Sequence, residues 1–168
     1  NCINNDLANN YGKLCQRVFA FIKKNCGNKI PLSSKLNEAD KKLLNNLKNS
    51  LPQLISLMNN QELNVYIKTV VNFSFDANKY FNDSEPWALK KKNPERMNAI
   101  LFTIVEQIKN ISILLNPIIP NATNKVLTML DISNENISID KINDNTILNN
   151  EKEIGNLEIL FTKIENDN

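Results

Sequence analysis

Residues 93–117 read NPERMNAILFTIVEQIKNISILLNP, and this stretch decides the predicted fold class. Asn93 suits the cap position of a helix, and Pro94 suits its first turn. Pro117 and Pro120 cannot continue the helix. Between these ends, apolar side chains recur every three or four residues. The spacing therefore predicts one long helix, with its core face formed by Met97, Ile100, Leu101, Ile104, Val105, Ile108, Ile111 and Leu115.

The same helical spacing recurs on both sides of this stretch, at residues 4–26, 37–60, 61–82 and about 121–130. No segment alternates with the period of two that a half-buried strand shows. Long helical segments joined by short breakers are typical of helical bundles. The sequence thus predicts an all-α, antiparallel bundle of about five helices.

Glycine and proline predict where these helices end. Gly27 is a natural left-handed stop for the first helix. Pro52 lies inside the second segment, so we expect a kink or a break near Ser50. The segment 61–82 is apolar around much of its circumference, and we expect it to be the most buried helix of the bundle.

After Asp131 the helical pattern weakens, and residues 131–152 are rich in Asn, Asp and Ser, which is typical of a loop. We therefore predict a helical domain at residues 1–130 and a loop-rich C-terminal tail at residues 131–168. We expect the tail to dock on the bundle through its last apolar patch, Leu157, Ile159, Leu160 and Phe161.

The composition bounds the class of protein. A chain of 168 residues with 42% apolar and 23% charged residues favours one globular domain. A net charge of +2 is too small for a protein that wraps duplex nucleic acid, so a few local contacts must carry any binding of nucleic acid. No apolar run approaches the ~20 residues that span a bilayer, so no membrane partner is expected. The three cysteines are expected to be free thiols in a reducing cytoplasm.

The residues that most enzymes use for catalysis are missing. The chain has no histidine, which removes the commonest general base. With three cysteines and no CxxC pair, the lack of histidine also excludes the usual zinc ligand sets. Acidic residues such as Asp40, Glu62 and Asp76 are dispersed as on solvated helix faces. With three glycines and no Gly-rich loop, no phosphate cradle is expected. We predict no catalytic residue, metal site or cofactor in this chain.

One candidate binding site lies on the polar face of the first helix. Lys13 and Arg17 are one helical turn apart, so both can contact the same ligand. Asn10 lies beside them, and Asn9 lies at the edge of the same sector. Amides with a guanidinium form a donor set that reads base edges and phosphates. The alternative is an ordinary solvated helix face.

The second candidate is Pro86-Trp87, at a break between two helices. A lone tryptophan in a helical domain is usually part of the core. The alternative is a platform on which an unpaired base stacks, with Lys90, Lys91 and Lys92 attracting phosphate. The spacing alone leaves both interpretations open.

Several motifs resemble those of one family in order along the chain. Asn5-Asp6-Leu7-Ala8-Asn9, with Gly12, Leu14 and Arg17 after it, resembles the opening N-x-D-L-A-N-x-x-G-N-L-x-x-R of the anticodon-binding domain of bacterial-type methionyl-tRNA synthetases. Further similar motifs are Ala77-Asn78-Lys79-Tyr80, Glu85-Pro86-Trp87-Ala88-Leu89-Lys90, Leu115-Asn116-Pro117-Ile118-Ile119-Pro120 and Leu160-Phe161-Thr162-Lys163-Ile164-Glu165.

The resemblance implies a class Ia synthetase that joins methionine to tRNA(Met) using ATP with magnesium. Its H-I-G-H and K-M-S-K-S motifs and its zinc knuckle would lie in a catalytic domain upstream, and neither motif occurs here. Since the chain also lacks an initiating methionine, we expect a piece of a longer cytoplasmic enzyme, inactive alone. Its expected partners are the anticodon loop of tRNA(Met) and its own catalytic domain.

The resemblance also implies roles for individual residues. Trp87, after Pro86, would stack on the first base of the CAU anticodon, and Arg17 would read the same cytosine. Lys13 replaces an asparagine of the family motif, and it can donate to the cytosine acceptors but cannot accept. Two alternatives remain: the anticodon-binding domain of another class Ia synthetase, such as the isoleucyl enzyme, and a helical protein-interaction module.

Overall fold

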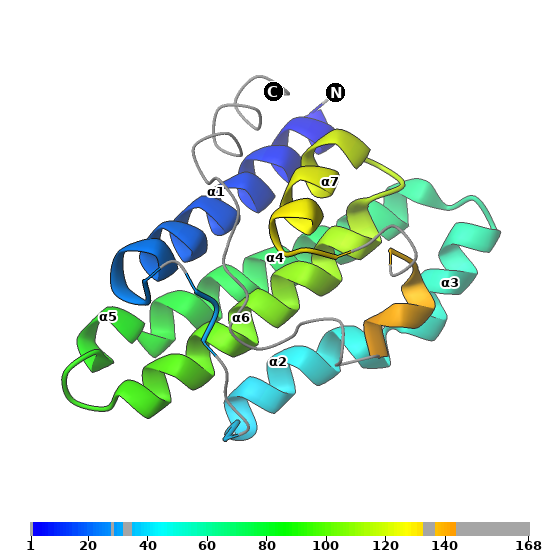
Figure 1. Cartoon of the computed structure of the whole chain (residues 1–168). Coiled ribbons are helices and arrows are strands. Elements are labelled where there is room, and N and C mark those ends of the chain that lie inside the picture. The colour runs from blue at the N-terminus through cyan, green and yellow to red at the C-terminus, as the bar shows by residue number, and fades with distance from the viewer. Residues whose placement is uncertain (1, 28, 32–34, 133–136, 144–168) are drawn as a thin grey trace.

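The computed structural model describes residues 2–27, 29–31, 35–132 and 137–143 (Figure 1). Helices dominate this part of the chain. They are α1 (Cys2–Asn25), α2 (Glu38–Asn49), α3 (Leu51–Asn59), α4 (Leu63–Ser84), α5 (Pro86–Leu89), α6 (Pro94–Leu115), α7 (Pro120–Met129) and the short 3₁₀ helix η2 (Ile139–Asn143).

The main helices alternate in direction along the chain, as predicted. Side-chain pairs between α1 and α4 rise together in residue number, from Asn10 with Asn78 to Arg17 with Asn82, so these two helices run in the same direction. The pair α2–α3 and the helix α6 run the opposite way (Figure 1). Helix α6 lies at the centre, in contact with α1, α2, α4, α5, α7 and η2. The predicted antiparallel helical bundle is confirmed.

The predicted breakers end the helices where expected. Gly27 adopts a left-handed φ of +62° just after α1. The second predicted segment is broken at Ser50 into α2 and α3, with Pro52 in the first turn of α3. The side chain of Asn93 accepts a hydrogen bond from the backbone N–H of Arg96 and thereby caps α6. The one-turn helix α5 is an addition to the predicted set.

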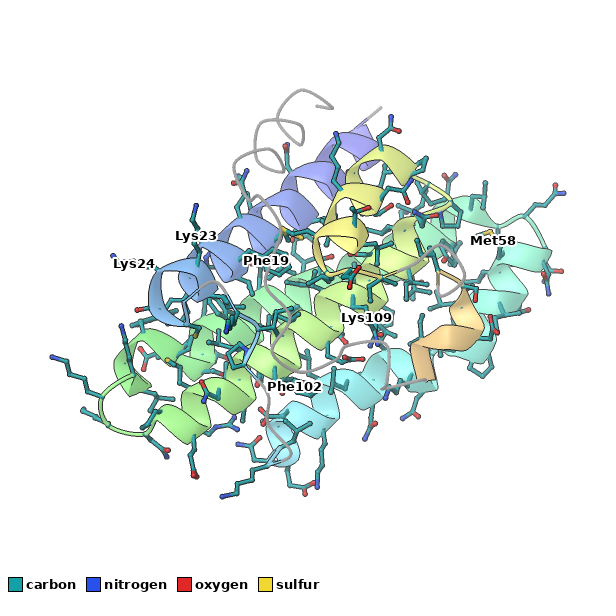
Figure 2. All side chains as sticks on the ribbon, in the orientation of Figure 1. Phe19, Lys23, Lys24, Met58, Phe102 and Lys109 are labelled. Carbon is teal, nitrogen blue, oxygen red and sulfur yellow. The ribbon has the colours of Figure 1, made fainter. Side chains whose placement is uncertain are left out.

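The expectation that the segment 61–82 would be the most buried was wrong, because α6 holds that position. Every residue from Thr103 to Leu115 in α6 is buried. Lys109 and Glu106 of this helix form an ion pair inside the protein, so their charges do not mark a solvent face. In Figure 2, Lys109 lies among the helices, whereas Lys23 and Lys24 extend outward from α1.

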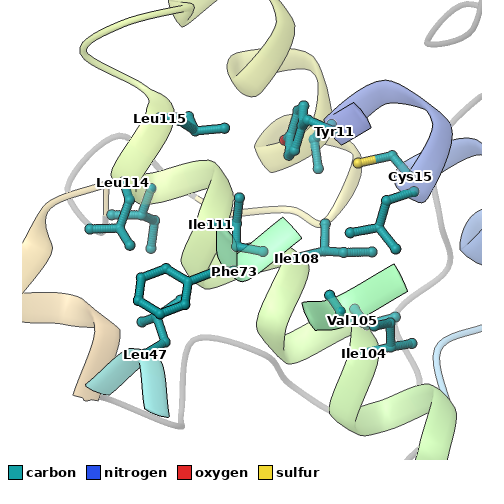
Figure 3. Packing of buried hydrophobic residues seen from close by; sticks show 14 of the residues in the cluster. Tyr11, Cys15, Leu47, Phe73, Ile104, Val105, Ile108, Ile111, Leu114 and Leu115 are labelled. Carbon is teal, nitrogen blue, oxygen red and sulfur yellow. The ribbon is translucent and has the colours of Figure 1, made fainter. Parts of the chain in front are cut away.

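Helix α6 is long and apolar enough to cross a membrane by length and composition. However, 89% of its most apolar window is already buried inside the bundle. The core around it includes side chains from several other helices (Figure 3). Tyr11 and Cys15 of α1 pack on one side, with Leu47 of α2 and Phe73 of α4 on another. The apolar character of α6 is therefore that of a core helix.

A buried carboxylate joins three helices at one end of the bundle. The side chain of Asp40 in α2 is 0% exposed and accepts two hydrogen bonds from the Arg96 guanidinium of α6, at 2.6 and 2.7 Å. It also accepts hydrogen bonds from the hydroxyl of Tyr80 in α4 and from the backbone N–H of Asn37. Burial by itself would raise the pKa of this carboxyl, but these hydrogen bonds outweigh burial and lower the pKa below its ordinary value.

Beyond α7 the chain continues along the bundle over its described residues. Ile132 and Ile142, the latter in η2, are both buried in the core. The apolar patch from Leu157 to Phe161 lies outside the described residues. The boundary at residue 130 and the docking of the tail thus remain predictions.

Replacing Asp40 by asparagine should destabilise the protein. Asp40→Asn leaves the largely buried guanidinium of Arg96 without a counter-ion, which should lower the free energy of unfolding at pH 7 by about 3 kcal/mol. Because the folded-state pKa of Asp40 is lowered, its contribution is complete above about pH 4 and is lost as the pH falls through the folded-state pKa. Urea titrations at several pH values measure both effects.

The matched control is Glu95→Gln, which breaks the exposed ion pair between Glu95 and Lys35. Water screens that pair, so the control should unfold almost like the wild type. The difference in the free energy of unfolding between the wild type and Asp40→Asn should become smaller as the pH falls into the acid range. A difference that stays constant from neutral to strongly acidic pH would contradict the proposed role of the charge.

Candidate functional site

A groove runs between the polar faces of α1 and α4. Its volume is about 530 Å³. Two cations, four amides and one phenyl ring line it, and among these described residues none carries a negative charge. The lining residues are Asn9, Asn10, Lys13 and Arg17 from α1, and Phe75, Asn78 and Asn82 from α4.

The guanidinium of Arg17 is held in a defined place at one end of the groove. It donates to the Asn82 carbonyl oxygen at 2.5 Å and to that of Asn78 at 3.5 Å. Its central carbon also lies 5.2 Å from the ring centroid of Phe81, within the range of a cation–π interaction. These contacts use part of the five N–H donors of arginine, and the others remain for a ligand.

Asn78 of α4 contacts two side chains of α1, Asn10 and Arg17. Its amide nitrogen donates to the side-chain oxygen of Asn10 at 2.9 Å and to the backbone carbonyl of Ser74 at 3.2 Å. With both bonds in place, its own carbonyl oxygen points toward Arg17. One half-buried amide thus orients Asn10 and Arg17 together.

Trp87 lies next to this end of the groove. Its side chain is 49% exposed. The indole packs against the ring of Phe81 in a T-shaped arrangement, with ring centroids 5.8 Å apart and an interplanar angle of 74°. Phe81 in turn packs against Phe21 of α1. Phe81 therefore contacts both the indole of Trp87 and the guanidinium of Arg17.

The backbone before Trp87 places the indole at the surface. Helix α4 ends at Glu85, which adopts a left-handed conformation with φ +46° and ψ +57°. The chain turns there, and Pro86 begins α5 with its ring buried. At the far end of α5, the ammonium of Lys90 donates to the Asn25 side chain at 3.2 Å, which ties α5 to the end of α1.

The structure brings most of the predicted site residues together. Asn9, Asn10, Lys13 and Arg17 share the groove, and Trp87 is joined to Arg17 through Phe81. Trp87 is not a core residue, because about half of it is open to water. Pro86 differs from the rest, since it is buried and offers little surface to a ligand.

Three groove residues on α4 were not predicted as site residues. Phe75, Asn78 and Asn82 lie three and four residues apart, which places them on one helical face. That spacing was visible in the sequence. However, only the packing of α4 against α1 shows that this face meets Lys13 and Arg17.

The groove has the chemistry of a site for single-stranded nucleic acid. Cations attract phosphate, amides can both donate to and accept from base edges, and an exposed aromatic ring can stack on an unpaired base. Unpaired bases are accessible to such side chains in loops of RNA. A short groove of this kind needs no strongly basic surface.

Comparisons with known proteins point to one family. Residues 30–168 match the family model described as the anticodon binding domain of methionyl tRNA ligase. The methionine–tRNA ligases of Brucella suis and Rickettsia felis are 36% and 37% identical to the chain over 132 and 138 residues, in each case 79% of the chain. The chain spans about a quarter of the length of these relatives, 26% and 27% respectively.

Solved structures agree with this assignment. The apo form of Mycobacterium tuberculosis methionyl-tRNA synthetase superposes with a TM-score of 0.82 at 26% identity, over 90% of this chain and 31% of that one. Its complex with methionyl-adenylate gives 0.83 at 25% identity, over 92% and 31%. The predicted resemblance to methionyl enzymes is confirmed, and the isoleucyl alternative is not supported. The chain belongs to the family of methionyl-tRNA ligase anticodon-binding domains.

Proposed function

We propose that the groove between α1 and α4, together with Trp87, binds the CAU anticodon of tRNA(Met). The observation that carries this proposal is the row formed by Arg17, Phe81 and Trp87. It sets a half-exposed indole beside a held guanidinium at the end of a groove lined by amides and cations. These are the two parts that recognition of an unpaired base needs, a stacking surface and directional hydrogen-bond donors.

In this proposal, the first anticodon base stacks on Trp87. Arg17 donates to the acceptor atoms of that cytosine, and its orientation comes from Asn78 and Asn82. Lys13, exposed one turn away, donates to the same base or to its phosphate. A cytosine has acceptors at O2 and N3, so Lys13 and Arg17, which can only donate, can both serve it.

Asn9, Asn10 and Pro86 have supporting roles in this proposal. The two amides line the same groove and can reach neighbouring bases of the loop. Asn10 already accepts a hydrogen bond from Asn78, so its free donors are directed away from that contact. Pro86 fixes the backbone before Trp87 and does not itself contact the base.

For the whole protein, we propose a methionine–tRNA ligase that uses ATP with magnesium. Its catalytic domain, with any zinc, would belong to the part of the relatives that this chain does not span. The chain would then act as the tRNA-recognition part, with residues 1–130 as the binding domain and residues 131–168 as a tail that docks on it. A cytoplasmic location fits this role and the free thiol of Cys15.

The first test is titration of the chain with an RNA stem-loop that carries CAU, and with one that differs only in the first anticodon base. We expect tighter binding of CAU, together with a change in the fluorescence of Trp87, the one tryptophan in the sequence. Trp87→Ala should weaken the binding of CAU by about 1–3 kcal/mol, the value of one base stack. Val65→Ala, at an exposed site on α4 outside the groove, is the control and should bind like the wild type.

Equal binding of both stem-loops would remove the proposed reading of the first base. A Trp87 signal that ignores both RNAs would remove the stacking role. Absence of binding altogether would favour a helical protein-interaction module.

The second test replaces Arg17 by lysine. Arg17→Lys keeps the charge but loses the planar fork that contacts Asn78, Asn82 and the base at the same time. We expect the preference for CAU over the altered first base to fall at least about fivefold, equivalent to the lower end of the ~1–3 kcal/mol of a well-formed base contact. The salt dependence of binding should change little, because the charge remains. An unchanged preference would show that the guanidinium acts only as a charge.

A further inference from the structure

Phe75 is an exposed aromatic side chain that the proposed reading of the first base does not use. It lies on α4 with 53% of its surface exposed, more than any other exposed large apolar side chain in the described part of the chain. It lines the groove on the same helical face as Asn78 and Asn82. The core of the bundle does not need this ring, because α4 packs through a different face that includes Phe73, Ala77 and Phe81.

The position of Phe75 differs from that of the other exposed apolar side chains. Ile55, Leu63 and Val65 are aliphatic and lie on α3 and the first turn of α4. Phe75 and Trp87, the two exposed aromatic residues in the described part of the chain, instead flank the polar groove. Arg17 and Asn82 lie at the Trp87 end, and Asn10 lies toward the Phe75 end.

We propose that Phe75 is a second stacking platform, for another unpaired base of the same RNA loop. This inference rests on the proposed function of the groove. The occupant is defined by its chemistry: a nucleobase π-face stacks on the phenyl ring, and any base can supply one. Lys13, between the two platforms, contacts the phosphate that joins the nucleotides.

The spacing of the two platforms defines the shape of the bound loop. Phe75 and Phe81, which contacts Trp87, are separated by about 9 Å along α4, at about 1.5 Å per residue. Successive bases in a continuous stack are only about 3.4 Å apart. The base on Phe75 therefore is not the stacked neighbour of the base on Trp87. It is a base splayed out from the loop, the second or the third of the anticodon.

A cycle of protein and RNA changes tests this inference. The full chain is titrated with the CAU stem-loop and with versions that have an abasic nucleotide at the first, second or third anticodon position. We expect Phe75→Ala to weaken binding of the intact stem-loop about fivefold or more, the lower end of the range for one stack. That loss should vanish with an abasic second or third position and persist with an abasic first position.

Two further variants separate stacking from other effects. Phe75→Leu keeps an apolar side chain without a π-face and should bind as weakly as Phe75→Ala, whereas Phe75→Tyr should retain binding. Val65→Ala is the matched control, because it removes exposed apolar surface from the same helix outside the groove. Thermal unfolding checks that each variant is folded, which is expected for an exposed helical position.

The outcomes distinguish this inference from the proposed function. If Phe75→Ala binds like the wild type while Trp87→Ala and the first-base change still weaken binding, the second platform is overturned and the anticodon site stands. If Phe75→Leu binds like the wild type while Phe75→Ala binds more weakly, the ring makes a simple apolar contact and does not stack, and the inference is overturned as well. Failure of the wild-type chain to bind any of the stem-loops overturns both.

Discussion

The rotation of α4 about its own axis is the constraint on which the site depends. Tyr80 donates its hydroxyl to the buried carboxylate of Asp40, which Arg96 of α6 also holds. That bond directs one face of α4 toward α2 and α6. Asn78 and Asn82 lie two positions before and after Tyr80, on roughly the opposite face of the helix, and are then directed toward α1. A buried charge with several partners is costly to misplace, so it specifies one orientation where apolar contacts alone permit several.

The groove itself is built from weak interactions that reinforce one another. Arg17 is exposed, so its hydrogen bonds to Asn78 and Asn82 add little to stability. These hydrogen bonds instead hold the Arg17 side chain in one conformation. A guanidinium that is fixed before binding loses less conformational entropy when a base binds. Phe81 helps to position both groups, because its buried ring contacts the guanidinium of Arg17 and the indole of Trp87.

The central helix shows why apolar periodicity can mislead about burial. Glu106 and Lys109 interrupt the apolar pattern of α6 and suggest a solvent face. Inside the bundle the two side chains neutralise each other across one helical turn. The segment that forms α4 is apolar around much of its circumference in sequence, but in the structure it leaves one face open at the groove. Its exposed Phe75 and Trp87 beyond its end are apolar residues that the fold does not bury.

The sequence by itself determined the helices, their breaks and the family, because these depend on local properties: the spacing of apolar residues, the fixed φ of Pro52 and Pro94, the freedom of Gly27, and motifs of short range. It also identified the polar face of α1 and the tryptophan at a helix break. It could not decide whether Trp87 is core or surface, or that Phe75, Asn78 and Asn82 complete the groove. Those facts depend on how α4 is rotated against α1 and where Phe81 lies, and only the long-range packing of side chains far apart in the chain decides them.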